Sequence, residues 1–412
     1  MKPLRILIPA IACVIFLLIA AALVYRQPNM KNIALADRAN LKFRSDGTFK
    51  IIQLADLQEA YYSSPIVREF LYGLAEKERP DLFVLTGDNI ASNPIKWWGV
   101  PAISRLWVKT SINGYMNVFD RIYKDFGIPV TMVFGNHDAE IRATSRRHQF
   151  DIYAGHKSFV GFTTDADIGT SDGQGEYLGT HNLLIRGSES SQPAFNLWLF
   201  DSGSYDPRGG YGCVQQPQLD WFNETNEALG HLPSVAFQHI IVPEVYDHMT
   251  QTDENDKHSY SWTFVGDNGE EYTKYISRTL PAGAGGVMDE APCPGKYNDG
   301  QFEALERAGN VIALFVGHEH VNTFELRREG VDLVNSPASG FGSYGTAHLR
   351  GARAITLYEE NPGDYDTEVV FYKDFYPDTW TRRARLNMYN RMKTSGAIAD
   401  AVSFKPLLWI MN

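Results

Sequence analysis

Five short segments that carry metal-binding side chains each follow an apolar run, and this arrangement limits the possible folds more than any other feature of the chain. The runs span residues 49–54, 82–86, 130–134, 234–237 and 311–316. They are rich in β-branched and aromatic residues and almost continuously apolar, which predicts strands that are buried on both faces. Stretches between them, such as 65–77 and 301–308, have the spacing of helices. We therefore expect an α/β fold in which helices cover a sheet.

The side chains that follow these runs belong to the types that bind metal ions. They are Asp56, Gln58, Asp88, Asn136, His137, His239, His318 and His320. In open α/β sheets, ligands bind beyond the carboxyl ends of the strands, so we expect most of these side chains to converge on one crevice. A carboxylate can bridge two cations, and imidazole and amide groups can complete the coordination. Two such cations would clamp a phosphoryl group and acidify a bound water, with one His left over for proton transfer.

Glycine precedes a candidate ligand in three of the five segments. These residues are Gly87, Gly135 and Gly317. Glycine permits tight turns and a close approach of the backbone that a Cβ atom would block. The glycines therefore fit a crowded site at the ends of the strands.

The order and spelling of the segments resemble the calcineurin-like metallophosphoesterase superfamily, whose pattern runs D-x-H, G-D, G-N-H-D/E, H, G-H-x-H. The resemblance covers about residues 49–375 and is closest to the short, single-domain members of the purple-acid-phosphatase-like branch. Residues 289–300 and 317–322 carry much of that likeness. The resemblance implies a four-layer αββα sandwich and a dinuclear metal centre that holds two divalent ions, with Mn, Fe and Zn as the candidates.

The resemblance also implies a role for each residue. The first metal would be held by Asp56, Gln58, Asp88 and His320, and the second by Asp88, Asn136, His239 and His318. The Asp88 carboxylate would then bridge the two ions. His137 would be a catalytic residue that is not a ligand, placed to stabilise the transition state or to protonate the leaving oxygen. Asp138 would orient its neighbours.

The chain departs from the family pattern at two positions. Gln58 stands where the family has its first His, and an amide oxygen is a harder and weaker ligand than imidazole, which favours hard cations such as Mn²⁺. Gln58 is either a weak ligand or a residue outside the coordination sphere. The manganese-dependent ADP-ribose and CDP-alcohol diphosphatases are similar in having Gln there. Ala91 stands where purple acid phosphatases proper carry the Tyr that binds ferric iron, so we expect no purple chromophore.

These features predict a metal-dependent phosphoric ester hydrolase. In this interpretation, a metal-bound hydroxide attacks the phosphorus of a phosphoester in line. The substrates would be phosphomonoesters, or phosphodiesters and nucleotide-diphosphate linkages if Gln58 marks a diphosphatase-like site. The alternative is a catalytically silent relative that binds a phosphorylated ligand or partner at the outer face of a membrane.

The N-terminus predicts attachment to a membrane. Residues 6–25 form an uncharged run of twenty residues preceded by Lys2 and Arg5. About 20 apolar residues in a helix match the hydrocarbon thickness of a bilayer, and the run is longer than the core of a signal peptide. We expect a signal anchor or transmembrane helix over 1–25 and an extracytoplasmic catalytic domain. Cleavage after Ala20-Ala21-Ala22, which would give a secreted protein, is the alternative.

The remaining sequence predicts a juxtamembrane linker over 26–48, one metallophosphoesterase domain over 49–375 and a C-terminal helical extension over 376–412. Residues 246–300 are irregular and predict a long loop or an inserted hairpin near the site. The formal net charge is −11. A nucleic-acid-binding surface would need clustered Lys and Arg, so we expect none.

Overall fold

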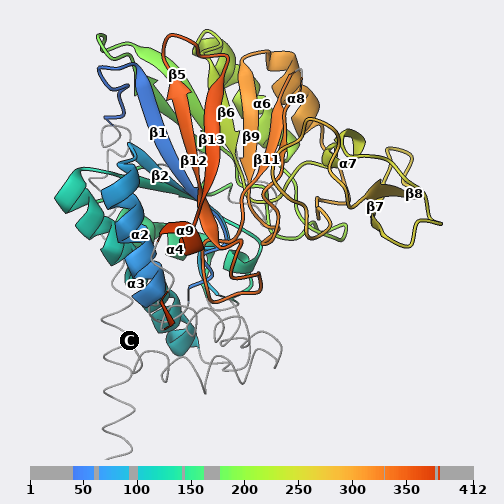
Figure 1. The fold of residues 1–412 in the computed structure, drawn as a ribbon, viewed down its shortest axis with the longest axis horizontal. Helices are drawn as coiled ribbons and strands as arrows, with labels where there is room; N and C mark the ends of the chain where they lie inside the picture. Colours follow the sequence, from blue (N-terminus) through green and yellow to red (C-terminus); the bar gives the residue numbers. More distant parts are fainter. Residues whose placement is uncertain are drawn as a thin grey trace, which may run out of the picture.

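Two β-sheets packed face to face form the centre of the protein (Figure 1). The architecture is that of a computed structural model, which describes residues 40–59, 65–91, 101–141, 144–161, 177–328, 330–375 and 379–380. Helices cover the outer face of each sheet, and a separate two-stranded hairpin projects from one side (Figure 1). The α/β class expected from the sequence is confirmed.

The first sheet has the strand order β13-β12-β1-β2-β3. Its strands are β1 (Thr48–Leu54), β2 (Leu82–Thr86), β3 (Val130–Val133), β12 (Gly351–Tyr358) and β13 (Tyr365–Phe371). Strands β1, β2 and β3 are parallel, whereas β12 and β13 pair in the antiparallel sense. The carboxyl ends of β1, β2 and β3 therefore meet at one edge of the sheet.

The second sheet has the strand order β10-β11-β9-β6-β5-β4. Its strands are β4 (His181–Arg186), β5 (Pro193–Leu199), β6 (Ser234–Phe237), β9 (Val311–Val316), β10 (Glu325–Leu326) and β11 (Asp332–Asn335). The four central strands β5, β6, β9 and β11 are parallel. Their carboxyl ends also meet at a single edge, so each sheet presents several strand ends together.

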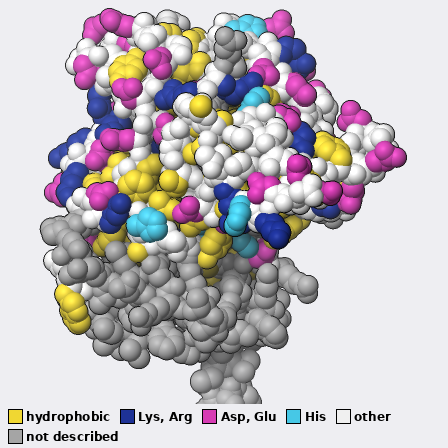
Figure 2. Space-filling view, turned by 45° about the vertical axis from the view of Figure 1, so that its right-hand side comes forward, with side chains coloured by type: hydrophobic (Ala, Val, Ile, Leu, Met, Phe, Trp, Pro, Cys, Tyr) yellow, Lys and Arg dark blue, Asp and Glu magenta, His cyan; other side chains and the backbone are white. Residues whose placement is uncertain are grey.

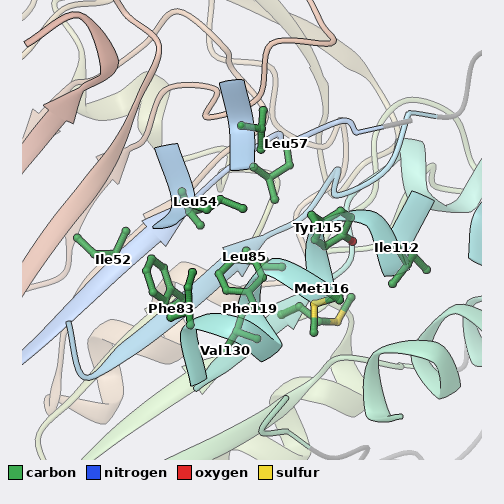
Figure 3. Packing of buried hydrophobic residues seen from close by; sticks show 14 of the residues in the cluster. Ile52, Leu54, Leu57, Phe83, Leu85, Ile112, Tyr115, Met116, Phe119 and Val130 are labelled. Atoms are coloured by element: carbon green, nitrogen blue, oxygen red, sulfur yellow. The ribbon is translucent and has the colours of Figure 1, made fainter. Parts of the chain in front are cut away.

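The helices lie in two outer layers. Helices α2 (Pro65–Glu78), α3 (Pro101–Phe126) and α4 (Arg146–Ala154) pack on the first sheet, and α6 (Gln216–Ala228) and α8 (Gln301–Ala308) pack on the second. The shorter helices are η3 (His137–Ala139), α7 (Val245–His248) and α9 (Tyr372–Phe375). Figure 3 shows Leu54 of β1 and Leu85 of β2 facing Tyr115 and Phe119 of α3.

Alternate side chains of each central strand enter different cores, which explains the continuous apolar runs. In β2, Phe83 and Leu85 pack against the helices, whereas Leu82 and Val84 pack against the second sheet. Phe237 of β6 lies in the same core between the sheets. The layers therefore follow the order helices, sheet, sheet, helices. A strand in such a position must be apolar on both faces.

The region between residues 246 and 300 was expected to be a long loop or an inserted hairpin, and it contains a hairpin. Strand β7 (Ser259–Val265) pairs with β8 (Glu271–Ser277) in the antiparallel sense. The hairpin projects beyond the two main sheets (Figure 1). Its inner residues Tyr260, Trp262 and Phe264 pack against the core under the second sheet. The hairpin is therefore anchored to the domain along one face.

The predicted termini lie mostly beyond what the structure describes. The predicted anchor over 1–25, most of the linker over 26–48 and almost all of the extension over 376–412 fall outside the described residues. Within the described ranges, no helix combines the length and the apolar character that a membrane span needs. The predictions for the termini stay predictions.

On the face drawn in Figure 2, basic and acidic side chains are interspersed.

Candidate metal centre

The edge where the parallel strands of both sheets end brings together the residues singled out in the sequence. Asp56 follows β1, Asp88 follows β2 and Asn136 follows β3; His239 follows β6, and His318 and His320 follow β9. In the part of the chain that the structure describes, Asp88, His239 and His318 form a buried group whose ligand atoms all lie within 4.8 Å of one another. Such a group could hold a metal ion.

Asp88 lies at the centre of this group. Its Oδ2 atom is 3.4 Å from Nε2 of His239 and 3.8 Å from Nε2 of His137. The same oxygen accepts a hydrogen bond from the Gln58 amide at 3.2 Å. Its Oδ1 atom accepts a hydrogen bond of 2.8 Å from the backbone N–H of His137. The carboxylate thus contacts residues from the ends of three other strands, as a bridging ligand would.

His239 connects Asp88 with two further candidate ligands. Its Nε2 atom lies 3.1 Å from Oδ1 of Asn136 and 3.3 Å from Nδ1 of His318. Its other ring nitrogen, Nδ1, lies 2.8 Å from the carbonyl oxygen of Thr86 and donates a hydrogen bond to it. This bond fixes the ring so that Nε2 points to the centre, which is the usual arrangement of a metal-binding histidine.

Asp56 and His320 form a second pair beside this group. The Oδ1 atom of Asp56 is 3.3 Å from Nε2 of His320, and Oδ2 accepts a hydrogen bond of 2.9 Å from the backbone of His318. Asp56 is fully buried, and its Oδ1 has no hydrogen-bond partner within the described ranges. A buried carboxylate oxygen without a donor is costly, and a cation would satisfy it. The residues present therefore fit a centre with two cations.

Gln58 lies within the group rather than apart from it. Its NH₂ group donates to Asp88, and the residue is buried. A half-turn of the amide would place its oxygen where the NH₂ group now lies. Gln58 therefore lies directly beside the central carboxylate of Asp88.

Backbone strain is concentrated at the candidate ligands. Six residues other than glycine have a positive φ within the described ranges, and four of them are Asp56 (φ 52°), Gln58 (41°), Asp88 (50°) and His318 (75°). The left-handed region is unfavourable for side chains larger than glycine. Such strain persists only where the surrounding structure enforces it, and it is most common at functional sites.

The glycines before the ligands are required by close contacts. A Cβ atom on Gly135 would lie 2.2 Å from Oδ1 of Asp88. One on Gly87, which also has a φ of 85°, would lie 2.7 Å from the ring of His239. One on Gly317 would lie 2.9 Å from a carboxylate oxygen. The expectation that these glycines permit a close approach of the backbone is confirmed.

Burial and the neighbouring charges shift the pKa values of His239 and His318 in opposite directions. Burial alone would lower the pKa of His239, but the adjacent carboxylates of Asp88 and Asp56 raise it to about 10. Burial lowers the pKa of His318 to about 3, and the positive charge of His239 adds to this effect. Burial opposes ionisation of Asp88, yet the charge of His239 brings its pKa below the usual range. Since metal ligands must be deprotonated, His318 is ready to bind, whereas His239 would release a proton.

His137 differs from the candidate ligands in its exposure and its partner. Its side chain is 38% exposed, and its Nδ1 atom lies 3.0 Å from Oε2 of Glu140. Burial lowers the pKa of His137, but the contact of its Nδ1 atom with the Glu140 carboxylate and the charge of Asp88 raise it overall. The other oxygen of Glu140 accepts a hydrogen bond of 2.8 Å from the hydroxyl of Tyr205. The sequence analysis does not predict a role for Glu140. Its position three residues after His137 is the one feature of the sequence that indicates the contact.

Asp138 holds the loops after β2 and β3 together. Its carboxylate accepts hydrogen bonds from the backbone N–H groups of Gly135 (2.9 Å), Asn89 (3.1 Å) and Ile90 (3.2 Å). Each of these loops carries candidate ligands. Asp138 therefore fixes their relative position from beneath the site.

The segment over 340–345 contains three glycines, and Arg350 and Arg353 follow it in the chain. Both arginines are buried, and Arg350 donates to the carbonyl oxygens of Gly340 and Ser343. Arg353 donates to Glu325 at 2.7 Å. Both guanidinium groups are therefore bound by the protein itself, and Arg350 braces the loop over 340–345.

The fold and the arrangement of the candidate ligands are those of a metallophosphoesterase, a class whose site takes divalent metal ions. The chain belongs to the calcineurin-like phosphoesterase family, which matches residues 49–322. It is 26% identical over 360 residues to the protein named "Probable inactive purple acid phosphatase 29" of Arabidopsis thaliana, a match that covers 79% of this chain and 80% of that protein.

Two further similarities extend this comparison. The chain is 24% identical over 314 residues to "Phosphatase DCR2" of Saccharomyces cerevisiae, covering 70% of this chain and 46% of that protein. A solved dimetal phosphatase from Danio rerio matches with a TM-score of 0.47 and 13% identity, covering 79% of this chain and 96% of that one.

Proposed function

We propose that this protein is a metal-dependent phosphoesterase that hydrolyses phosphate esters with two divalent cations. The proposed ligands are Asp56, Gln58, Asp88, Asn136, His239, His318 and His320. The observation that carries the proposal is the buried contact of Asp88 with His239 and His318. When bound, the cations would activate a water for in-line attack and screen the charge of the phosphoryl oxygens. The mixed nitrogen and oxygen donors suit Mn, Fe or Zn.

The residues of the chain supply the remaining functions. His137 would donate a proton to the leaving oxygen or a hydrogen bond to the phosphoryl group. Its raised pKa favours the protonated form that can donate. Glu140 holds the imidazole by its Nδ1 atom, so that Nε2 is directed toward Asp88 and the centre.

A second candidate function is a catalytically silent protein that binds a phosphorylated ligand. It is favoured by the amide of Gln58 at a position where the family has an imidazole, and by relatives whose names contain the words "probable inactive". Against it, a protein that only binds phosphate has no need for a partly exposed His137 that is paired with Glu140. We therefore favour the enzyme.

Metal reconstitution tests the proposal. The full chain is stripped of metal, reloaded separately with Mn²⁺, Zn²⁺, Fe²⁺ or Mg²⁺, and assayed for hydrolysis of an aryl phosphomonoester and an aryl phosphodiester. Metal content is measured in parallel. We expect Asp88→Asn to lose both bound metal and turnover, and His137→Ala to keep the metal but lose turnover. Asp267→Asn, an exposed change in the turn between β7 and β8, is the matched control.

The outcomes separate the two functions. Bound metal without hydrolysis of either ester would favour the silent protein. Absence of bound metal with every cation would refute the metal centre itself. Loss of metal in His137→Ala would show that His137 is a ligand.

We also propose that the catalytic domain is extracytoplasmic and anchored by residues 1–25. The apolar run over 6–25 and its basic flank support this proposal. Cell fractionation of the full chain, followed by protease treatment of intact cells, tests it. A protein in the membrane fraction that external protease digests agrees with the proposal, a protein in the culture medium indicates cleavage, and a cytoplasmic protein would contradict both.

A further inference from the structure

Three aromatic rings form a row that begins at the candidate metal centre. The ring of Tyr211 lies edge-on to the ring of His318, with centroids 4.5 Å apart and planes at 82°. The rings of Tyr205 and Trp262 both stack beside Tyr211, at 5.8 Å and 23° and at 6.2 Å and 9°. The three planes are therefore nearly parallel. We call Tyr205, Tyr211 and Trp262 the aromatic row.

The aromatic row is accessible although it adjoins a buried site. Tyr205 is 52% exposed, and Tyr211 and Trp262 are half-buried. Large exposed aromatic side chains beside a catalytic site are a common means of binding a flat ligand, because every planar π-system can stack on them.

The row is held rigidly. Tyr205 and Tyr211 face each other as an antiparallel bridge across a tight loop, in which the N–H of Asp206 donates to the carbonyl of Gly210 at 3.1 Å. Gly210 packs so closely on Lys296 that a Cβ atom there would lie 2.9 Å from that side chain. A platform that is ordered in advance loses little conformational entropy when a ligand binds.

The row touches the candidate centre at two points. Tyr211 contacts His318 directly, and Tyr205 donates to Glu140, which in turn contacts His137. The row thus adjoins both a proposed ligand and the proposed proton donor. A flat substituent of a phosphoester at the centre would find its nearest stacking surface here.

We propose that the aromatic row binds a planar aromatic group of the substrate, so that the enzyme prefers nucleoside or aryl-substituted phosphoesters to purely aliphatic ones. The proposal rests on the proposed phosphoesterase function and specifies its substrate class. A nucleobase and a simple aryl ring share the chemistry that the row recognises. Stacking of one base on one aromatic side chain corresponds to about a tenfold gain in affinity.

Two matched pairs of substrates test the preference. Adenosine 5′-monophosphate and ribose 5-phosphate both release a primary alcohol and differ in the base. Benzyl phosphate and cyclohexylmethyl phosphate also release primary alcohols and differ in the aromatic ring. With the metal-loaded full chain, we expect kcat/KM to be about tenfold higher for the aromatic member of at least one pair. A preference in both pairs assigns the row to aryl groups in general, and one limited to the first pair assigns it to nucleobases.

Two variants of Tyr205 separate its ring from its hydroxyl. Tyr205→Phe keeps the ring and removes the hydrogen bond to Glu140, whereas Tyr205→Leu removes both. The measured quantity is the ratio of kcat/KM for the aromatic substrate to kcat/KM for its aliphatic partner. We expect Tyr205→Phe to keep this ratio and Tyr205→Leu to lower it several-fold. Trp262→Leu, in strand β7, should lower the same ratio. Equal ratios in the Phe and Leu variants, or a ratio near one in the unchanged protein, would overturn the proposal.

A binding measurement keeps this test distinct from the test of catalysis. Adenosine has no phosphate, so its binding to the full chain, measured by calorimetry, does not depend on turnover. We expect adenosine to bind to the unchanged protein and to Tyr205→Phe, and several-fold more weakly to Tyr205→Leu. If no ester is hydrolysed but this pattern holds, the proposed catalysis fails and the stacking site stands. If hydrolysis occurs without any effect of the Leu variants, the row is a packing contact.

Discussion

The ring of Tyr344 lies flat against the ring of His320, with centroids 3.9 Å apart and planes at 11°. The Nδ1 atom of His320 also donates to the carbonyl oxygen of Tyr344 at 2.7 Å. The hydroxyl of Tyr344 donates to Glu290 at 2.8 Å, and Glu290 accepts a further bond from the backbone of Val321 at 3.0 Å. Tyr344 therefore fixes the orientation of His320 by its ring and its backbone together, with Nε2 directed at Asp56.

Removal of the Tyr344 ring should weaken cation binding at the proposed first metal site. Groups that orient a metal-binding histidine change the metal affinity by about 10- to 100-fold when mutated. We expect Tyr344→Ala to lower the affinity for Mn²⁺ by about tenfold, because His320 keeps its backbone bond but loses its stacking partner. Tyr344→Phe, which keeps the ring and loses only the bond to Glu290, should have the smaller effect. Calorimetric titration of the metal-free proteins with Mn²⁺ measures the affinity of each variant and of the unchanged protein. Equal affinities for the unchanged protein, Tyr344→Phe and Tyr344→Ala would show that the ring does not hold His320.

An alanine at position 135 should disrupt the site through steric overlap alone. The added Cβ would lie 2.2 Å from Oδ1 and 2.3 Å from the backbone nitrogen of Asp88. Overpacking of this kind typically costs about 1–3 kcal/mol of unfolding free energy, and here it also displaces the proposed bridging carboxylate. We expect Gly135→Ala to lower both the melting temperature and the metal content.

Gly363→Ala is the matched control for this change. A Cβ atom at Gly363 would meet no atom within 4 Å, and its φ lies outside the left-handed region. We expect its melting temperature and metal content to match those of the unchanged protein. Full metal loading in Gly135→Ala would mean that Asp88 can move without loss of its function.

The sequence predicts the central strands well because burial on both faces leaves a clear pattern. Strands β2, β6 and β9 lie at the expected residues 82–86, 234–237 and 311–316. The edge strand β4 is not predicted, because only Leu183, Leu184 and Ile185 of its residues are apolar and they form no long run. Helix α3 was also missed, although its buried residues Val108, Ile112, Tyr115, Met116 and Phe119 have helical spacing.

Residues of the site can be predicted from the sequence only where a potential ligand comes directly after a strand. Asp88 and His239 could be found because each comes just after an apolar run. Tyr344 and Tyr205 could not, because their partners His320 and Glu140 are 24 and 65 residues away in the chain. Stacking and hydrogen bonding between loops depend on how the loops cross, which no local pattern records.

The contact between Glu140 and His137 predicts a loss of turnover without a loss of metal. Glu140→Gln removes the charge that holds the imidazole by Nδ1 and raises its pKa. General acid–base groups contribute about 10²–10⁴-fold to rates, so loss of the orienting partner should cost roughly tenfold in kcat, a fraction of that range. KM and bound metal should stay unchanged. A parallel fall of metal content and kcat would instead place Glu140 among the groups that support the ligands.

Acid should destabilise the protein through His181, which is fully buried in β4. Its Nδ1 donates to the carbonyl of Gly179 at 2.8 Å, and its Nε2 accepts from the hydroxyl of Thr131 at 3.0 Å, so the neutral ring is satisfied. Burial lowers its pKa from 6.5 to about 4. Between these pH values the unfolded chain binds a proton that the folded chain does not. The unfolding free energy should therefore fall as the pH drops from about 6.5 to 4, by roughly 3 kcal/mol from this residue.

Chemical denaturation at a series of pH values measures this contribution as a difference between proteins. His181→Gln should be less stable at neutral pH, because the glutamine cannot reproduce both hydrogen bonds, but its stability should fall less steeply between pH 6.5 and 4. His258→Gln, at an exposed position before β7, is the control and should keep the slope of the unchanged protein. Other groups titrate in the same range, but they do so in all three proteins and cancel in the comparison. If His181→Gln and the unchanged protein lose stability in parallel, the buried ring takes up its proton in the folded state and burial does not hold it neutral.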